Sequence, residues 1–490
     1  MMEVDTESSS GSEPLAQADL ETMRKLEHKK RVRLGYVMAL FCAVFWGLWY
    51  VPGEAVWVIN PFDQLKATIA VTDGDALATV ITSVLITGLN ALFVVIALLV
   101  WNGALGKLRE MGRTVRQVRH CTKWFLLASI FGAMAVIGSF IAMGFVGAAF
   151  AAVAGLMYPV VGSILARFTG QKVSKRAIFG ILAIVVGGVT VYAGGLIEDL
   201  ANGGGSIWGY VGGLMAAVGW GTEGVIASKG LDVAEPDIGI TLRFAGEAVI
   251  WCAIALPLLA ILGYPVFTYA AQIFDPLTIG ILIMLGITFG FCYVTWYKSF
   301  TLIGVNRGQG VGNLYGICAV IFLFLFMGKT PDWTIVLGGI LCVAGSLIMF
   351  TEGSLELESL KTNEVINNES PASSKKHPKA SQAPTANASK NGKTASKTHL
   401  KPIKFRILEL YSDGEEHWNS EVVKIIQSEY GMKSGYGRDS INFDIIELAA
   451  GGLLKEVDVT QDDASYKAGA LLHKYRITEF GKNQPCLAGN

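Results

Sequence analysis

The stretch GYVMALFCAVFWG, from Gly35 to Gly47, returns 174 positions later as GYVGGLMAAVGWG, from Gly209 to Gly221. Eight of the thirteen positions are identical, including the Gly-Tyr-Val triplet at the start and the Trp-Gly pair at the end. Each copy opens a long apolar segment. Small and aliphatic residues recur by chance in membrane helices, whereas both of these motifs in one register do not. The pattern therefore indicates that the chain carries its membrane unit twice.

The composition is that of a membrane protein with polar ends. Apolar residues make up 52% of the 490 residues and charged residues only 16%, unlike a soluble globular protein of this length. Charged residues are concentrated in residues 1–33 and 354–490. Most of the seven cysteines lie in or beside apolar segments without a CxxC pair, and the six histidines lie outside the expected spans. We therefore expect no disulfide, no metal site and no cofactor.

Ten segments are long and apolar enough to cross a bilayer, for which about 20 residues are required. They are residues 34–58, 76–101, 123–143, 146–167, 175–194, 207–229, 237–263, 276–301, 307–328 and 332–351. The predicted fold is an all-α polytopic membrane protein with two five-helix repeats, residues 34–194 (the first half) and 195–353 (the second half). Because each half has an odd number of helices, the second enters the membrane from the opposite side, and the repeat is predicted to be inverted.

A second correspondence supports this division. GLMYP, from Gly155 to Pro159, resembles GNLYG, from Gly312 to Gly316, and each is followed by another span. Those two spans share glycines at equivalent positions, Gly180 with Gly338 and Gly187 with Gly345. The two halves therefore correspond beyond their first helices.

Basic residues predict the direction of the chain. They are concentrated in residues 24–33, 107–123 and 167–176, all on the side that the helix count assigns to the N-terminus. Because basic residues are enriched in cytoplasmic loops, that side is expected to be the cytoplasm. Ten crossings return the C-terminus there. The chain is thus predicted to be a multi-pass protein of the cell membrane, with both termini, including the polar segment 1–33, in the cytoplasm.

With these features the membrane part, residues 34–352, resembles the drug/metabolite transporter superfamily, in its EamA-like group, and also its glucose and rhamnose uptake relatives. The resemblance rests on two five-helix halves, a Trp-Gly pair in the first helix of each, and a Leu/Tyr-containing fourth helix followed by a glycine-rich fifth. It implies an alternating-access carrier of small solutes and names no substrate. Walker, HExxH and GxSxG motifs are absent from the spans, so no enzyme is expected.

Four charged residues stand out in the expected spans, since a charge costs about 3 kcal/mol at a helix centre. Arg243 and Glu247 are four residues apart on one helix and are expected to form a structural pair. Glu54 lies near the outer end of its span, where simple exposure explains it equally well. Glu223 is deeper, without a partner close in sequence, and is our predicted coupling residue, able to bind a proton or a cationic group. Neither acid is duplicated by the repeat.

Aromatic and amide residues near the middle of the spans form the second candidate set. They are Trp46, Trp49, Tyr50, Asn90, Tyr158, Trp220, Tyr293, Asn313 and Tyr315. A cavity lined by rings and a few amides suits a sugar, whose C–H faces stack and whose hydroxyls need partners, and it equally suits an aromatic or cationic metabolite. The alternative is packing or an interfacial belt. Abundant glycines such as Gly132, Gly138, Gly144 and Gly147 are assigned to close helix contact and given no site role.

The C-terminal part is predicted to hold a linker and a small soluble domain. Residues 354–400 are rich in Ser, Ala, Asn, Pro and Lys and are expected to be a disordered linker. Residues 401–490 show three helical stretches and two strand-like stretches, and resemble an archaeal-type winged helix, which implies DNA binding by the third helix. Their eleven basic and fourteen acidic residues lack the basic surface that phosphates require. Protein contact is therefore favoured over DNA binding.

The sequence thus predicts a secondary transporter of a small polar metabolite, with a sugar and proton coupling as the specific hypotheses. The alternative is a membrane sensor that signals through residues 401–490 to a protein partner or to DNA. The expected partners are the solute, the lipid bilayer and, as an open alternative, a second copy of the chain.

Overall fold

A computed structural model of the chain describes residues 13–168, 175–201, 204–351, 400–462, 466, 469–484 and 487. The chain divides into two compact units, which we name the membrane unit (Met1–Ser354 with Thr460–Leu471) and the C-terminal unit (Leu355–Val459 with Leu472–Asn490). The predicted linker, 354–400, lies outside the described residues except for Leu400, as does the start of the predicted N-terminal segment.

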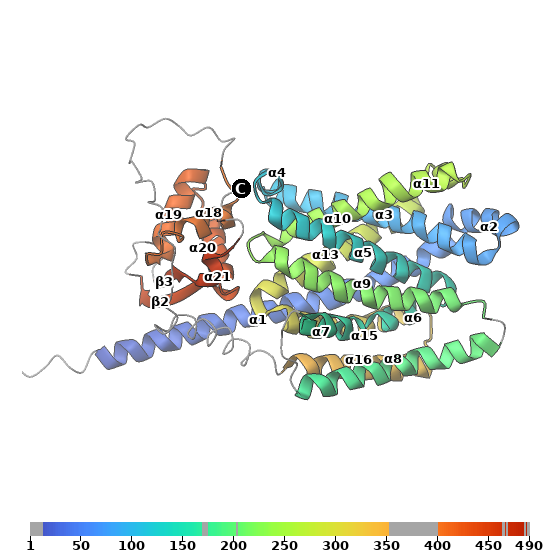
Figure 1. Cartoon of the computed structure of the whole chain (residues 1–490), viewed down its shortest axis with the longest axis horizontal. Helices are drawn as coiled ribbons and strands as arrows, with labels where there is room; N and C mark the ends of the chain where they lie inside the picture. Colours follow the sequence, from blue (N-terminus) through green and yellow to red (C-terminus); the bar gives the residue numbers. More distant parts are fainter. Residues whose placement is uncertain are drawn as a thin grey trace, which may run out of the picture. The chain divides into compact units, whose positions relative to one another are not determined.

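The membrane unit is built of helices (Figure 1). In chain order they are α1 (Glu13–Ala55), η1 (Val56–Val58), α2 (Phe62–Asp73), α3 (Asp75–Ala104), α4 (Leu108–Gln117), α5 (Arg119–Phe145), α6 (Ala148–Gly155), α7 (Tyr158–Phe168), α8 (Lys175–Ala201), α9 (Ile207–Leu231), α10 (Pro236–Ala248), η2 (Val249–Ala255), α11 (Leu256–Ile261), α12 (Val266–Ala270), α13 (Pro276–Ile303), α14 (Val305–Gly312), α15 (Tyr315–Met327) and α16 (Trp333–Thr351).

Among the described residues, eight helical segments are long and apolar enough to cross a membrane, and each overlaps one predicted span. The other two predicted spans are helical as well. The apolar stretch of α16, Trp333–Met349, is short, and the glycine-rich α9 is not among the eight. The multi-pass helical architecture is therefore confirmed, whereas the count of ten spans and the inverted repeat stay predictions.

Two connections between predicted spans contain helices that the sequence pattern did not predict, α2 and α4. Helix α2 buries Phe62, Leu65 and Ile69, which are spaced three and four residues apart and so share one face. Helix α4 carries the basic residues that indicate the cytoplasmic side and ends with Arg116 in its last turn, where a cation interacts favourably with the helix dipole. Both were missed because charged residues interrupt their short apolar patterns.

The fourth helix predicted in each half is broken into two, α6 with α7 and α14 with α15. The breaks lie within the two corresponding stretches, GLMYP and GNLYG. Leu156 and Leu314 each donate a backbone N–H to the carbonyl three residues back, at 3.1 Å, so the regular helical ladder is interrupted. Tyr158 and Tyr315 consequently stand at the first positions of α7 and α15.

Glycines allow several helix pairs to approach closely. Helices α8 and α16 lie side by side (Figure 1). A Cβ atom on Gly180 would lie 2.5 Å from the carbonyl oxygen of Gly345, and one on Gly187 would lie 2.6 Å from that of Gly338. Gly138 of α5 meets Gly212 of α9 in the same way. Small residues at these crossings are the usual device for close packing in membranes.

The C-terminal unit contains α18 (Ile403–Leu410), β1 (His417–Trp418), α19 (Asn419–Tyr430), α20 (Gly435–Ala450), α21 (Glu479–Lys482) and most of β2 (Leu454–Gln461) and β3 (Leu471–Ile477). Its strands form one sheet in the order β1-β3-β2, and β1 pairs antiparallel with β3. The three helices and two longer strands correspond to the stretches expected from the sequence, and β1 and the short α21 are additions. Assignment to the winged-helix fold stays a resemblance.

Glu409 of α18 is the centre of an ion-pair group in this unit. It pairs with Lys401 and, at 2.6 Å, with Arg406, which also pairs with Glu429 at 2.8 Å. Burial alone would raise the pKa of Glu409, but the hydrogen bonds and charges of Lys401 and Arg406 more than offset this, and its pKa lies below the ordinary value. The carboxylate form is therefore favoured by folding.

Candidate functional site

Glu223, Arg243 and Glu247 form one buried group, the charged triad, with all three side chains 0% exposed. Glu223 comes from α9 and the other two from α10. Arg243 donates from Nε to Glu223 Oε1 at 2.6 Å and from Nη2 to Glu223 Oε2 at 3.1 Å, while Nη1 donates to Glu247 Oε2. The hydroxyl of Tyr293 on α13 donates to Glu223 Oε2 at 3.1 Å. The pair predicted within α10 is thus one side of a three-residue network.

The triad changes the interpretation of Glu223. This acid has no partner near it in sequence, but the fold brings Arg243 to it in two-point contact. Glu54 is not part of the group: it accepts from the backbone N–H of Ala148 at 2.9 Å, at the start of α6, and pairs with Lys329 at 2.9 Å. Only three of the four charged candidates therefore share one site.

Gly132 on α5 provides the space for the guanidinium group. A Cβ atom at this position would lie 1.8 Å from Arg243 Nη2 and 2.3 Å from its Cζ. One helical turn away, the Ser129 hydroxyl donates to the backbone carbonyl of Arg243 at 2.8 Å. The assignment of Gly132 to helix contact alone was incomplete, because a single sequence does not show which side chain faces a glycine.

Six rings form a second buried group, the aromatic cluster, whose members come from both halves. They are Trp46, Tyr158, Trp220, Tyr293, Trp296 and Tyr315. Trp46 stacks on Tyr315 with ring centroids 4.4 Å apart and meets Trp220 edge-on at 4.9 Å. The two tryptophans that the repeat equates are therefore in contact. Tyr293 belongs to both groups, because its ring meets Trp46 at 5.9 Å and its hydroxyl reaches Glu223.

The remaining neutral candidates lie around this cluster. The indole N–H of Trp49 donates to Asn90 Oδ1 at 3.1 Å, and its ring stacks on Phe289 at 4.3 Å. The ring of Tyr50 lies parallel to that of Tyr315, 6.1 Å away. All nine neutral candidates are buried.

The two helix breaks exchange hydrogen bonds across the halves. The Tyr158 hydroxyl donates to the backbone carbonyl of Gln309 on α14 at 3.1 Å. In the other direction, Asn313 Nδ2 donates to the carbonyl of Leu156 at 3.4 Å and to the Ser346 hydroxyl at 2.5 Å. The Leu156 carbonyl lies in the first break, whereas the Gln309 carbonyl also accepts from the backbone N–H of Asn313 at 3.0 Å and so takes a second bond from Tyr158. Gln309 and Ser346 were missed by sequence reasoning, since nothing local distinguishes them.

Several buried polar atoms around the cluster have no hydrogen-bond partner within the described part of the chain. They are Nε1 of Trp46, Trp220 and Trp296, the hydroxyls of Tyr50, Tyr297 and Tyr315, Asn90 Nδ2 and Asn313 Oδ1. An unpaired buried polar group costs about 1–3 kcal/mol, and folded proteins contain few of them. Their concentration at one place, between the two halves, is what a site for a hydrogen-bonding ligand or for water requires.

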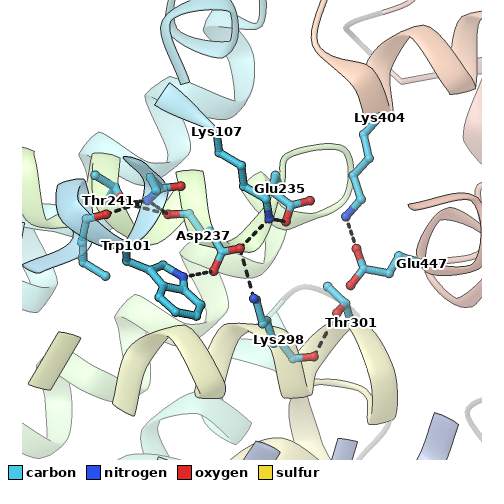
Figure 2. Close-up of polar contacts among 11 residues, drawn as sticks. Trp101, Lys107, Glu235, Asp237, Thr241, Lys298, Thr301, Lys404 and Glu447 are labelled. Carbon is cyan, nitrogen blue, oxygen red and sulfur yellow. Dashed lines mark hydrogen bonds and ion pairs between the residues drawn. The ribbon is translucent and has the colours of Figure 1, made fainter. Parts of the chain in front are cut away.

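A second charged group, the Asp237 cluster, lies at the start of α10 (Figure 2). Asp237 is fully buried and is contacted by Lys107 at 2.6 Å, by Lys298 at 3.1 Å and by the indole N–H of Trp101 at 3.1 Å. Lys107 also pairs with Glu235. Burial alone would lower the pKa of Lys107, but Glu235 and Asp237 outweigh it and raise the pKa above its ordinary value. Lys107 is therefore charged at physiological pH.

The Asp237 cluster connects the two halves. Trp101 and Lys107 belong to the first half, whereas Glu235, Asp237 and Lys298 belong to the second. In the sequence, Lys107 was one of many basic residues indicating the cytoplasmic side, and only the fold shows that it has a buried acidic partner.

Comparison with known proteins finds a family similarity in the second half of the membrane unit. Residues 207–351 match the model of the EamA-like transporter family. No curated protein matches the chain. Among solved structures, one titled "Crystal structure of protein" is 16% identical, with 66% of this chain and 98% of that chain covered and a TM-score of 0.42. This match covers the second half of the membrane unit, which is thus similar to the EamA-like transporter family, and together with the apolar helices it indicates a membrane transporter of the drug/metabolite transporter type.

Proposed function

We propose that the protein is a secondary carrier that moves a small polar metabolite across the cell membrane by alternating access between its two halves. The observation that carries the proposal is the aromatic cluster, to which both halves contribute and around which unpaired polar atoms gather. Sites at a repeat interface, formed by broken helices, are the general plan of such carriers. We further propose that both termini face the cytoplasm.

The polar atoms of the site favour a neutral, hydroxyl-rich solute, with a sugar as the specific candidate. Indole N–H groups only donate, while tyrosine hydroxyls both donate and accept, so the site matches a ligand with several acceptors and a few donors. Its rings offer faces and edges for C–H groups. An anionic solute is disfavoured. Among the described residues, the cation near the cluster is Arg243, and two carboxylates already share it.

Alternating access requires the halves to separate at one end of the bundle at a time. Two sets of ion pairs join the halves in the described structure. Lys107 with Asp237 and Glu235 joins them at the end predicted to be cytoplasmic, and Glu54 with Lys329 joins them at the predicted outer end. In this mechanism each set breaks when its own end opens, while the other set holds the opposite end closed. The charged triad supplies the acids for coupling to a proton.

Flux in proteoliposomes tests the carrier function. Purified full-length protein and a variant ending at residue 353 are reconstituted, and uptake of sugars, amino acids, nucleosides and amines is measured. We expect one class of solute, sugars first, to raise the melting temperature of both proteins and to be taken up by both, since a ligand stabilises the state that binds it. Loss of uptake in Trp46→Ala, with the fold retained, would tie the flux to the cluster. Absence of uptake for every solute in both proteins would contradict the proposal.

A sensor is the second candidate function, and the separate C-terminal unit is the observation that favours it. In that case the membrane unit binds its solute without moving it, and residues 401–490 report the bound state to a protein partner or, less favoured by their charge, to DNA. The same truncation separates the two functions. Solute uptake by the protein ending at residue 353 excludes the sensor as the sole function, whereas binding without uptake, together with partner capture by the full chain, supports it.

A further inference from the structure

We infer that Glu247, rather than Glu223, is the acid that binds the proton in the membrane unit. The inference rests on the proposed carrier function for its physiological role, but the protonation itself is a property of the triad. It differs from the sequence-based prediction, which placed coupling on Glu223.

The first argument is charge balance. Two carboxylates and one guanidinium leave the triad with one uncompensated negative charge when both acids are ionised. All three side chains are 0% exposed, so water does not stabilise that charge. An unbalanced buried charge costs several kcal/mol even after the surroundings relax. One proton makes the triad neutral, and the question becomes which carboxyl group holds it.

The second argument is the hydrogen bonding of the four carboxylate oxygens. Both oxygens of Glu223 accept bonds from Arg243, and one of them also accepts from Tyr293. Both oxygens of Glu223 are thus satisfied by donors. Glu247 receives one bond from Arg243, at Oε2, while its Oε1 has no hydrogen bond of good geometry within the described residues, although the indole of Trp251 lies beside the carboxyl group. An orphan acceptor is stabilised least as an anion, so Oε1 of Glu247 is the atom that takes the proton.

The third argument is the backbone next to Glu247. The segment Val249–Ala255, which begins two residues after it, is a π-helix rather than an α-helix. A π-helical turn is wider, and such turns recur at functional sites. The irregularity occurs in the helix that carries Glu247, and the α9 segment that carries Glu223 is regular. The backbone around Glu247 is thus the more readily rearranged one.

The groups that surround the triad include no other charged side chain that could take the proton. On α13 the titratable side chains that face the triad are Cys292, Tyr293 and Tyr297, and Cys252 lies in η2. All are neutral in their ordinary protonated forms. Helix α3 carries no charged residue after its first position, and α5 carries none after Lys123 in its first turns. The proton therefore moves between water and Oε1 of Glu247, forming one O–H bond on binding and breaking it on release.

Infrared difference spectroscopy of the purified full-length protein in lipid tests the assignment without any solute. A protonated carboxyl group has a C=O stretch of its own, and we expect such a band to disappear reversibly when the pH is raised. The band should disappear in both Glu247→Gln and Glu223→Gln, since either change leaves Arg243 with a single acid and a neutral pair. Glu54→Gln is the matched control and should leave the band unchanged.

Conservative variants then identify the protonated residue. Glu247→Asp should move the band, because the carbonyl that carries the proton has changed. Glu223→Asp and Tyr293→Phe should leave it in place, since Tyr293 touches Glu223 and not Glu247. A band that moves in Glu223→Asp or Tyr293→Phe but not in Glu247→Asp overturns the assignment, and so does the absence of any titrating band. Because no flux is measured, this outcome is independent of whether the protein proves to be a carrier.

Discussion

Replacing Gly132 by alanine is expected to disrupt the charged triad from outside it. The added Cβ would lie 1.8 Å from Arg243 Nη2, 2.3 Å from Cζ and 2.6 Å from Nε. Non-bonded heavy atoms normally stay about 3.5 Å apart, so the guanidinium group must move by more than about 1 Å. Its bonds of 2.6 and 3.1 Å to Glu223 do not survive such a shift.

The magnitude follows from what is left behind. Removing the cation from a buried ion pair costs about 3–5 kcal/mol, because the carboxylates stay buried without compensation. We therefore expect the melting temperature of Gly132→Ala to fall by about 5–10 °C, taking about 2–4 °C per kcal/mol and some recovery by relaxation. The assay is thermal unfolding of the full-length protein in detergent and in lipid, followed by solute flux where the protein stays folded.

Two controls isolate the cause. Gly290→Ala on α13 meets only ordinary contacts, the nearest atom lying 3.7 Å away, and should change the melting temperature little. Gly138→Ala would press on the backbone of Gly212 at 2.6 Å and should destabilise the α5–α9 crossing without touching Arg243. If Gly132→Ala melts at the same temperature as Gly290→Ala, the view that Gly132 makes room for the triad is refuted.

Three further predictions concern other parts of the structure. In a variant that lacks the native cysteines, Lys107 and Glu235 are replaced by cysteines and joined by a short bifunctional thiol reagent. This link should stop solute flux until it is cleaved. Uninterrupted flux would show that this end does not open. Asn313→Ala should lower stability by about 1–3 kcal/mol, more than Ser346→Ala, because it orphans two buried acceptors; equal melting temperatures would contradict this. Folding lowers the pKa of Glu409, so its carboxylate stabilises the fold above its ordinary pKa, and this stability is lost as the pH falls through the folded-state pKa. Amide exchange in residues 400–484 of the full chain should therefore rise on acidification less in Glu409→Gln than in wild type.

Much of the membrane architecture could be predicted from local pattern. Long apolar runs identify spans because the backbone of a single segment in a bilayer satisfies its hydrogen bonds by forming a helix. Among the described residues, eight such helices occur where they were expected. In GLMYP, Pro159 has no N–H to donate to the carbonyl of Gly155, which favours the break in the preceding turn, whereas GNLYG contains no proline and its break could not be predicted from the sequence. The irregular backbone of the first break becomes favourable once Asn313, from the other half, reaches the carbonyl group of Leu156.

The sequence by itself predicted which segments enter the membrane, where the rings and charges are placed along each span, and that Trp46 and Trp220 occupy equivalent positions in the two similar stretches. Periodicity and the cost of burying polar groups act locally, so a single chain displays them. Only the tertiary structure decided that Glu223 meets Arg243, that Gly132 makes room for it, and that Lys107 reaches Asp237 in the other half. Charges in a low-dielectric interior must find partners in space, and helices distant in sequence provide them. For this reason the spans could be predicted from the chain, whereas the ion pairs between them could not.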